Sequence, residues 1–69
     1  MSDIPMEVQA QIIQQKIQMW RNTEYDAQLD AEIAQVLDDA QMKAAAVQRM
    51  KNAKKAVAEL EKKLKGISI

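Results

Sequence analysis

Few side chains in this sequence could act as nucleophiles or general bases. The 69-residue chain contains no Cys and no His, so it lacks thiolates, imidazoles and the usual zinc ligands. Its hydroxyl groups belong to Ser2, Thr23, Tyr25 and Ser68, and no imidazole is present to activate them. The single glycine, Gly66, cannot form a phosphate-binding loop, which needs several glycines. We therefore expect a protein that is not an enzyme, with no catalytic residue and no cofactor.

Acidic side chains that could bind a metal ion occur near the middle of the chain. Asp26 and Asp30 are four residues apart, which places both carboxylates on one face of a helix, and Glu24 is nearby. Carboxylate oxygens are the ligands that Mg²⁺ and Ca²⁺ prefer. Two-metal sites in helical bundles combine such carboxylates with His, which this sequence lacks. A solvated or lysine-paired acidic face is the favoured interpretation, and no metal site is predicted.

The C-terminal part of the chain carries a basic face. Five lysines project within about 100° of one another on a helix, opposite its apolar side. This face defines an alternative hypothesis, a small nucleic-acid-associated regulatory protein whose binding falls steeply with added salt. The net charge is zero and no aromatic residue lies among the lysines to stack on bases, so a solvated face is favoured. The candidate anion contacts are Lys51, Lys54, Lys55, Lys62 and Lys65.

Helices must position these side chains, because the only strong helix breakers lie near the two ends of the chain. These are Pro5 and Gly66. The residues between them are rich in good helix formers, and no segment shows the alternation of a strand. Ser2 or Asp3 can cap the first turn, and Gly66 follows a basic stretch as a C-terminal stop. The sequence therefore predicts an all-α protein.

A turn at Asp38 and Asp39 is predicted to fold the chain into an antiparallel helical hairpin. Asp39 can cap a new helix that starts at Ala40, and Asp38 can end the preceding helix. The predicted helices, which pack like a coiled coil, cover about 5–37 and 40–65. They form one domain over residues 1–69, with short frayed termini at 1–4 and 66–69.

The predicted register pairs residues whose numbers sum to about 77. It lays an acidic segment, 24–39, against a basic segment, 43–55, and makes Asp26 face Lys51. Exposed ion pairs are weak, so these charges select the register more than they stabilise it. The same register aligns five apolar pairs, which are Ile33 with Ala44, Trp20 with Val57, Ile17 with Leu60, Ile13 with Leu64 and Ala10 with Ile67.

Two other arrangements remain open at the level of sequence. An antiparallel dimer of two long helices without a turn would also place acidic segments against basic ones. A break at Asn22 and Thr23 would instead give three helices, over about 5–21, 24–37 and 40–65. The hairpin is favoured because Asp-Asp is a poor helix interior and two residues make a short corner.

Apolar stripes predict that the hairpin self-associates. The first helix carries one stripe with Ile13 and Ile17 and an adjacent one with Val8 and Ile12 that continues through Leu29, Ile33 and Val36. One partner helix cannot cover both stripes, so we expect a homo-oligomer, with a dimer favoured. The predicted interface residues are Met6, Ile12, Ile13, Ile17, Met19 and Trp20.

The expected function follows from these stripes and from the scarcity of reactive groups. We expect a non-enzymatic helical protein–protein interaction module, of the scaffold or adaptor kind, that self-associates and binds a further protein partner. No segment approaches the roughly 18 apolar residues of a membrane span, and the N-terminus lacks the pattern of a signal peptide. A cytoplasmic location is therefore expected, and nucleic acid is not the expected partner.

Overall fold

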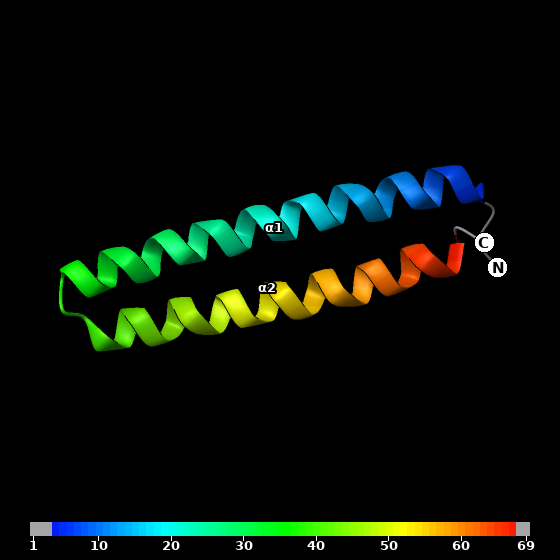
Figure 1. Cartoon of the computed structure of the whole chain (residues 1–69). Coiled ribbons are helices and arrows are strands. Elements are labelled where there is room, and N and C mark those ends of the chain that lie inside the picture. The colour runs from blue at the N-terminus through cyan, green and yellow to red at the C-terminus, as the bar shows by residue number, and fades with distance from the viewer. Residues whose placement is uncertain (1–3, 68–69) are drawn as a thin grey trace.

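Two antiparallel helices make up the protein in a computed structural model that describes residues 4–67. Helix α1 spans Met6–Val36 and helix α2 spans Ala40–Ile67. The helices lie side by side along their length, so the start of α1 and the end of α2 are at the same end of the molecule (Figure 1). The described residues contain no strand. The predicted all-α antiparallel hairpin is therefore confirmed.

Helix α1 begins one residue later than predicted. Pro5 occupies the cap position, with φ −56° and ψ 149°, and its carbonyl accepts the Gln9 N–H at 3.0 Å. The Gln9 side chain also donates to the Ile4 carbonyl at 2.7 Å. Ser2 and Asp3, the predicted capping residues, lie outside the described residues, as do the other chain-end positions 1 and 68–69.

Helix α2 continues through Gly66 and ends at Ile67, so the prediction that Gly66 stops this helix was wrong. Gly66 does not adopt the positive φ that a glycine uses to end a helix. Continuing the helix keeps Ile67 in phase with Leu60 and Leu64, and all three are half-buried. Their apolar contacts offset the low helix propensity of glycine, which costs about 1 kcal/mol relative to alanine.

The connection between the helices is a Schellman motif with aspartate in the position that usually holds glycine. The N–H of Asp39 donates to the Ala34 carbonyl at 2.9 Å, and that of Asp38 donates to the Gln35 carbonyl at 3.2 Å. Asp38 has a left-handed φ of 57°. The Asp39 carboxylate then accepts the Met42 N–H at 3.0 Å and caps α2. Both predicted roles, the stop and the cap, are confirmed.

Replacing Asp38 with glycine is expected to raise the free energy of unfolding by up to about 1 kcal/mol. A left-handed backbone costs an L-residue about 1–2 kcal/mol, and the greater freedom of glycine in the unfolded chain offsets part of that gain. Urea unfolding followed by circular dichroism measures the change. As the control, Asp39→Ala removes the cap and should lower stability by about 1 kcal/mol. Lower stability of Asp38→Gly would contradict this turn geometry.

Helix α1 is continuous through Asn22 and Thr23, so the three-helix alternative was wrong. The Thr23 hydroxyl donates to the Met19 carbonyl one turn earlier, at 3.1 Å. The Gln18 amide donates to the Asn22 side chain at 2.9 Å. Both side chains are thus bonded along the helix instead of capping a new one. The turn at residues 37–39 also excludes an uninterrupted long helix.

The seam, defined as the face of each helix that packs against the other, is lined by small side chains. Among the described residues no large side chain is fully buried. Small side chains allow two helices to approach closely, but each alanine removes little apolar area from water. The core of this hairpin is therefore thin. Its buried members are Ile17, Ala27, Ala34, Ala46, Ala53 and Val57.

The register of the hairpin follows from polar contacts between the helices. Lys43 donates to the Gln35 side chain at 2.6 Å, and Lys54 lies 3.9 Å from the Glu24 carboxylate. In each of these two pairs the residue numbers sum to 78, close to the predicted sum of 77. Asp26, however, pairs with Arg49 and not with Lys51 as predicted. The long guanidinium fork of Arg49 reaches it from two residues nearer the turn.

Candidate interaction surface

Helix α1 is apolar on two faces, and α2 covers only one of them. Ile17, Ala27 and Ala34 are buried on the seam. The second face is turned about 150° away from the seam at about 100° per residue, and its large apolar residues are 40–81% exposed. We call it the outer face of α1. It consists of Val8, Ile12, Met19, Leu29, Ile33 and Val36.

The two helices differ in what they expose. Every large apolar side chain that is exposed in the described part of the chain belongs to residues 4–37, and none belongs to α2. The apolar residues of α2 recur on its seam, where Val57 is buried and Leu60 and Leu64 are half-buried. An exposed apolar stripe on one helix of a small domain is typical of a surface that another element covers. The outer face of α1 is therefore the candidate interaction surface.

The six residues predicted to form an interface divide between the two faces of α1. Ile17 is buried, and Ile13 and Trp20 are half-buried at the same three- and four-residue spacing, so these three belong to the seam inside one chain. Ile12 and Met19 are exposed on the outer face. Met6, in the first turn of α1, is exposed as well. The structure does not bring the six together into one patch.

The predicted pairing of Ile33 with Ala44 inside the hairpin was wrong. Both side chains are exposed, and Ile33 continues the outer face between Leu29 and Val36. Near the turn the seam is occupied by the smaller Ala34, one position further along α1. Val8, Leu29, Ile33 and Val36 were not among the predicted interface residues. Their helical spacing places them on the same face as Ile12 and Met19, and this pattern was the sequence signal that they belong to the same surface.

The accessible surface of the chain is large for its mass. It amounts to 5449 Å², whereas a folded monomer of 7.8 kDa typically exposes about 4,400 Å². The radius of gyration of 15.7 Å likewise exceeds the value of about 11 Å for a compact domain of this length. Both values reflect the elongated shape of a two-helix hairpin, which measures 50 × 19 × 14 Å.

Arg49 links the two helices beside the outer face. Its guanidinium donates to the Asp26 carboxylate at 2.9 Å and to the Asp30 carboxylate at 2.8 Å. The hydrogen bond that Arg49 donates to Asp26, and then the one that it donates to Asp30, raise the pKa of Arg49. A pKa raised in the folded state stabilises it at every pH below the ordinary arginine value, so this contribution persists through the neutral range. The side chains are exposed, so solvent screens both pairs and each contributes little to stability.

The same contacts occupy the carboxylates that were considered as metal ligands. Asp26 and Asp30 both face the Arg49 guanidinium, and Glu24 lies near the Lys54 ammonium. Within residues 4–67 no group of three or more potential ligands gathers as a metal site would require. The acidic side of α1 therefore forms ion pairs with Arg49 and Lys54 of α2.

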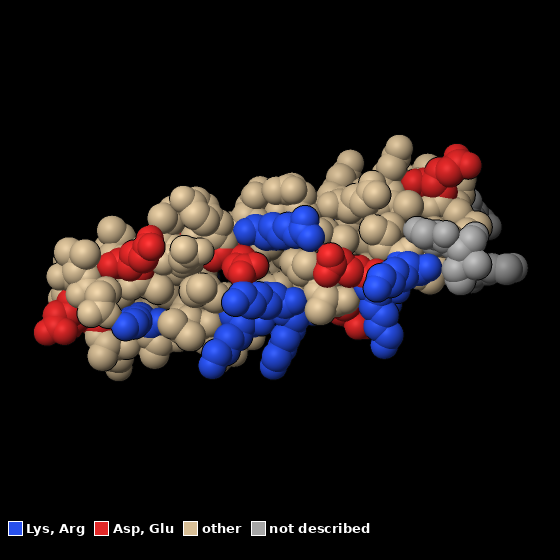
Figure 2. Space-filling model, in the orientation of Figure 1, with Lys and Arg blue, Asp and Glu red and all other residues tan. Residues whose placement is uncertain are grey.

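The five lysines considered as anion contacts are all exposed on α2. Basic side chains project from the α2 side of the molecule, and acidic groups lie at the turn, along the middle of the molecule and near the start of α1 (Figure 2). Lys54 lies within 3.9 Å of Glu24. Arg21, on α1, pairs with Glu61 of α2 at 3.3 Å. The lysine face is thus accessible, and acidic groups lie close to part of it.

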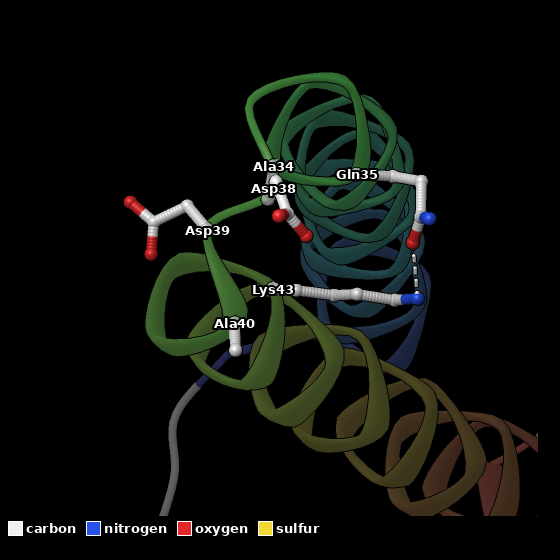
Figure 3. Close-up of a pocket in the computed structure, with 6 residues that line it drawn as sticks. All are labelled: Ala34, Gln35, Asp38, Asp39, Ala40 and Lys43. Atoms are coloured by element: carbon white, nitrogen blue, oxygen red, sulfur yellow. Dashed lines mark hydrogen bonds between the residues drawn. The ribbon is translucent and has the colours of Figure 1, made fainter.

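A shallow hollow lies at the turn, between the end of α1 and the start of α2 (Figure 3). The hydrogen bond from Lys43 to Gln35 spans one side of it. The residues around it already bond to one another or to the backbone to form the turn. The hollow is therefore a by-product of the Schellman motif. Its lining consists of Ala34, Gln35, Asp38, Asp39, Ala40 and Lys43.

No helix within residues 4–67 combines the length and apolar character needed to cross a bilayer. Comparisons with models of protein families, with curated proteins and with solved structures found no match for this chain, so its own geometry carries the functional argument.

Proposed function

We propose that this protein is a non-enzymatic helical interaction module that self-associates through the outer face of α1. The observation that carries the proposal is the line of six exposed large apolar side chains on the one face of α1 that α2 cannot reach. Helices in soluble proteins normally turn such a stripe toward another element. An apolar stripe at three- and four-residue spacing is also the surface that a partner helix recognises.

The thin core of the hairpin supports the same proposal. Four of its six buried residues are alanines, and a chain below about 70–80 residues rarely gains enough stability from one core alone. The sequence contains no Cys, so disulfides cannot supply the difference. Covering the outer face would bury additional large side chains and stabilise the hairpin. Self-association and folding are then linked by mass action.

The test replaces two outer-face residues together, in the variant Ile12→Gln/Ile33→Gln. The wild-type chain is expected to elute with a mass above that of the 7.8 kDa monomer, and the double variant at the monomer mass. Both substituted residues are exposed within one chain, so the variant leaves the seam intact. Size-exclusion chromatography with light scattering measures the mass, and circular dichroism measures helix content. An unchanged oligomer in the double variant would contradict the proposal.

The control variant is Lys51→Gln/Lys54→Gln/Lys55→Gln, which changes the exposed lysine face and removes one exposed contact between the helices, that of Lys54 with Glu24. It should retain the mass of the wild-type assembly. The same variant tests the second candidate function, nucleic-acid association, which the clustering of exposed lysines on α2 favours. That function predicts binding to duplex DNA that falls steeply with salt and is weakened in this variant. Retained self-association without DNA binding supports the interaction module.

A further inference from the structure

We propose that the outer face of α1 is covered by the outer face of a second copy, packed antiparallel to the first with Asn22 at the two-fold axis. This inference rests on the proposed function and adds the identity and direction of the partner helix. The resulting assembly is a row of four helices with the two α1 helices in contact at its centre. The α2 helices, with their lysine faces, lie on the outside.

Four of the six apolar residues of the outer face, the two at each end, are arranged nearly symmetrically about Asn22. Val8 and Val36 are each 14 positions from it, and Ile12 and Ile33 are 10 and 11 positions away. In an antiparallel pair each apolar end therefore meets the opposite apolar end of the second copy. The polar centre of the face, around Asn22, meets itself. This spacing permits the pairing, but a parallel pair would also align apolar ends with apolar ends.

Charge selects the antiparallel direction. The half of α1 near the turn, residues 22–36, contains four acidic side chains and no basic one. The half near the start of the helix, residues 6–21, contains one acidic and two basic side chains. An antiparallel pair places the acidic half of each copy beside the basic half of the other. A parallel pair places the acidic halves of the two copies beside each other. Repulsion between these like charges costs free energy and disfavours that pairing.

The charged residues that flank the outer face show the same preference. With Asn22 at the axis, Lys16 of one copy lies beside Asp30 of the other, and the pair occurs twice by symmetry. In a parallel pair the Asp26 carboxylates of the two copies would face each other. Asp26 is seven residues from both Met19 and Ile33 and so lies within the face itself, where the Arg49 guanidinium, 2.9 Å away, compensates its charge. An antiparallel helix pair with such flanking charges resembles the pairing logic of coiled coils.

The test measures distances between spin labels on two equivalent positions of α1. Gln11 and Gln18 are both exposed and lie seven residues apart, so they point in the same direction from the helix. The chain has no Cys, so Gln11→Cys and Gln18→Cys each carry one label per chain. In the antiparallel pair the labels at position 11 are separated along the axis by 22 residues, about 33 Å. The labels at position 18 are separated by eight residues, about 12 Å.

Double electron–electron resonance on the two labelled chains is expected to give a distance about 20 Å longer at position 11 than at position 18. As a control, adding Ile12→Gln/Ile33→Gln to either labelled chain should abolish the intermolecular signal. Equal distances at both positions, or a longer distance at position 18, would overturn the antiparallel inference and leave the proposed function standing. Absence of an intermolecular signal together with a monomer mass would overturn both.

Discussion

Replacing Ile17 with alanine is expected to lower the free energy of unfolding of the hairpin by about 2–5 kcal/mol. Ile17 is only 7% exposed, and it is the one buried residue of α1 that is larger than alanine. Truncation removes its apolar contacts and leaves a cavity that the remaining small side chains of the seam cannot fill. The loss is a large part of the total stability of a 69-residue domain, which is about 3–10 kcal/mol.

Thermal unfolding at several protein concentrations distinguishes this effect from a loss of self-association. Because the contacts of Ile17 lie inside one chain, Ile17→Ala should lower the Tm at every concentration. The control is Ile12→Ala, five residues away on the outer face, which should mainly reduce the dependence of Tm on concentration. Equal behaviour of the two variants would show that the seam and the outer face have been wrongly separated.

Replacing Ala53 with leucine is expected to destabilise the hairpin by about 1–3 kcal/mol, because the seam has no room for a larger side chain. Ala53 and Ala27 are both 0% exposed. Their residue numbers sum to 80, close to the sum of 78 for the polar pairs between the helices, so the two alanines lie near each other across the seam. A leucine here pushes the helices apart. The separation should also lengthen neighbouring contacts between the helices, among them the pair of Lys54 with Glu24.

The matched control is Ala58→Leu, on the exposed side of the same helix. Alanine and leucine are both good helix formers, so this change should leave the stability nearly unaltered. Urea unfolding of both variants measures the two free energies. If Ala53→Leu were as stable as Ala58→Leu, the close approach of the helices at this alanine pair would be disproved.

The turn could be predicted from sequence because its determinants are local. Asp39 caps α2 through its own carboxylate, and together with Asp38 it forms an adjacent pair of poor helix formers between two long helical segments. The role of Asn22 and Thr23 was harder to judge, since both types cap helices and also bond back along them. The hydrogen bond from Thr23 to Met19 is the one that forms. The end of α2 was missed because the contacts of Ile67 outweigh the low propensity of Gly66.

The seam and the outer face could be recognised from sequence as two apolar stripes, but they could not be assigned. A helical wheel gives the directions of Ile13, Ile17 and Ile12 around the helix. It does not show which of them pack against the second helix of the same chain. The assignment depends on the small residues of both helices near the turn, where Ala27 and Ala53 determine the side of close approach. For the same reason Ile33 was placed in the seam, although Ala34 occupies it. The partner of Asp26 depended on the reach of Arg49 and not on register alone.

Sedimentation equilibrium of the unmodified chain over a range of concentrations tests the central claim, that the outer face of α1 is covered by self-association. Helix content is followed by circular dichroism at the same concentrations. We predict a species of twice the 7.8 kDa chain mass at high concentration, with helix content that falls as dilution dissociates it. A fully helical species that remains at the monomer mass at every concentration would contradict the account.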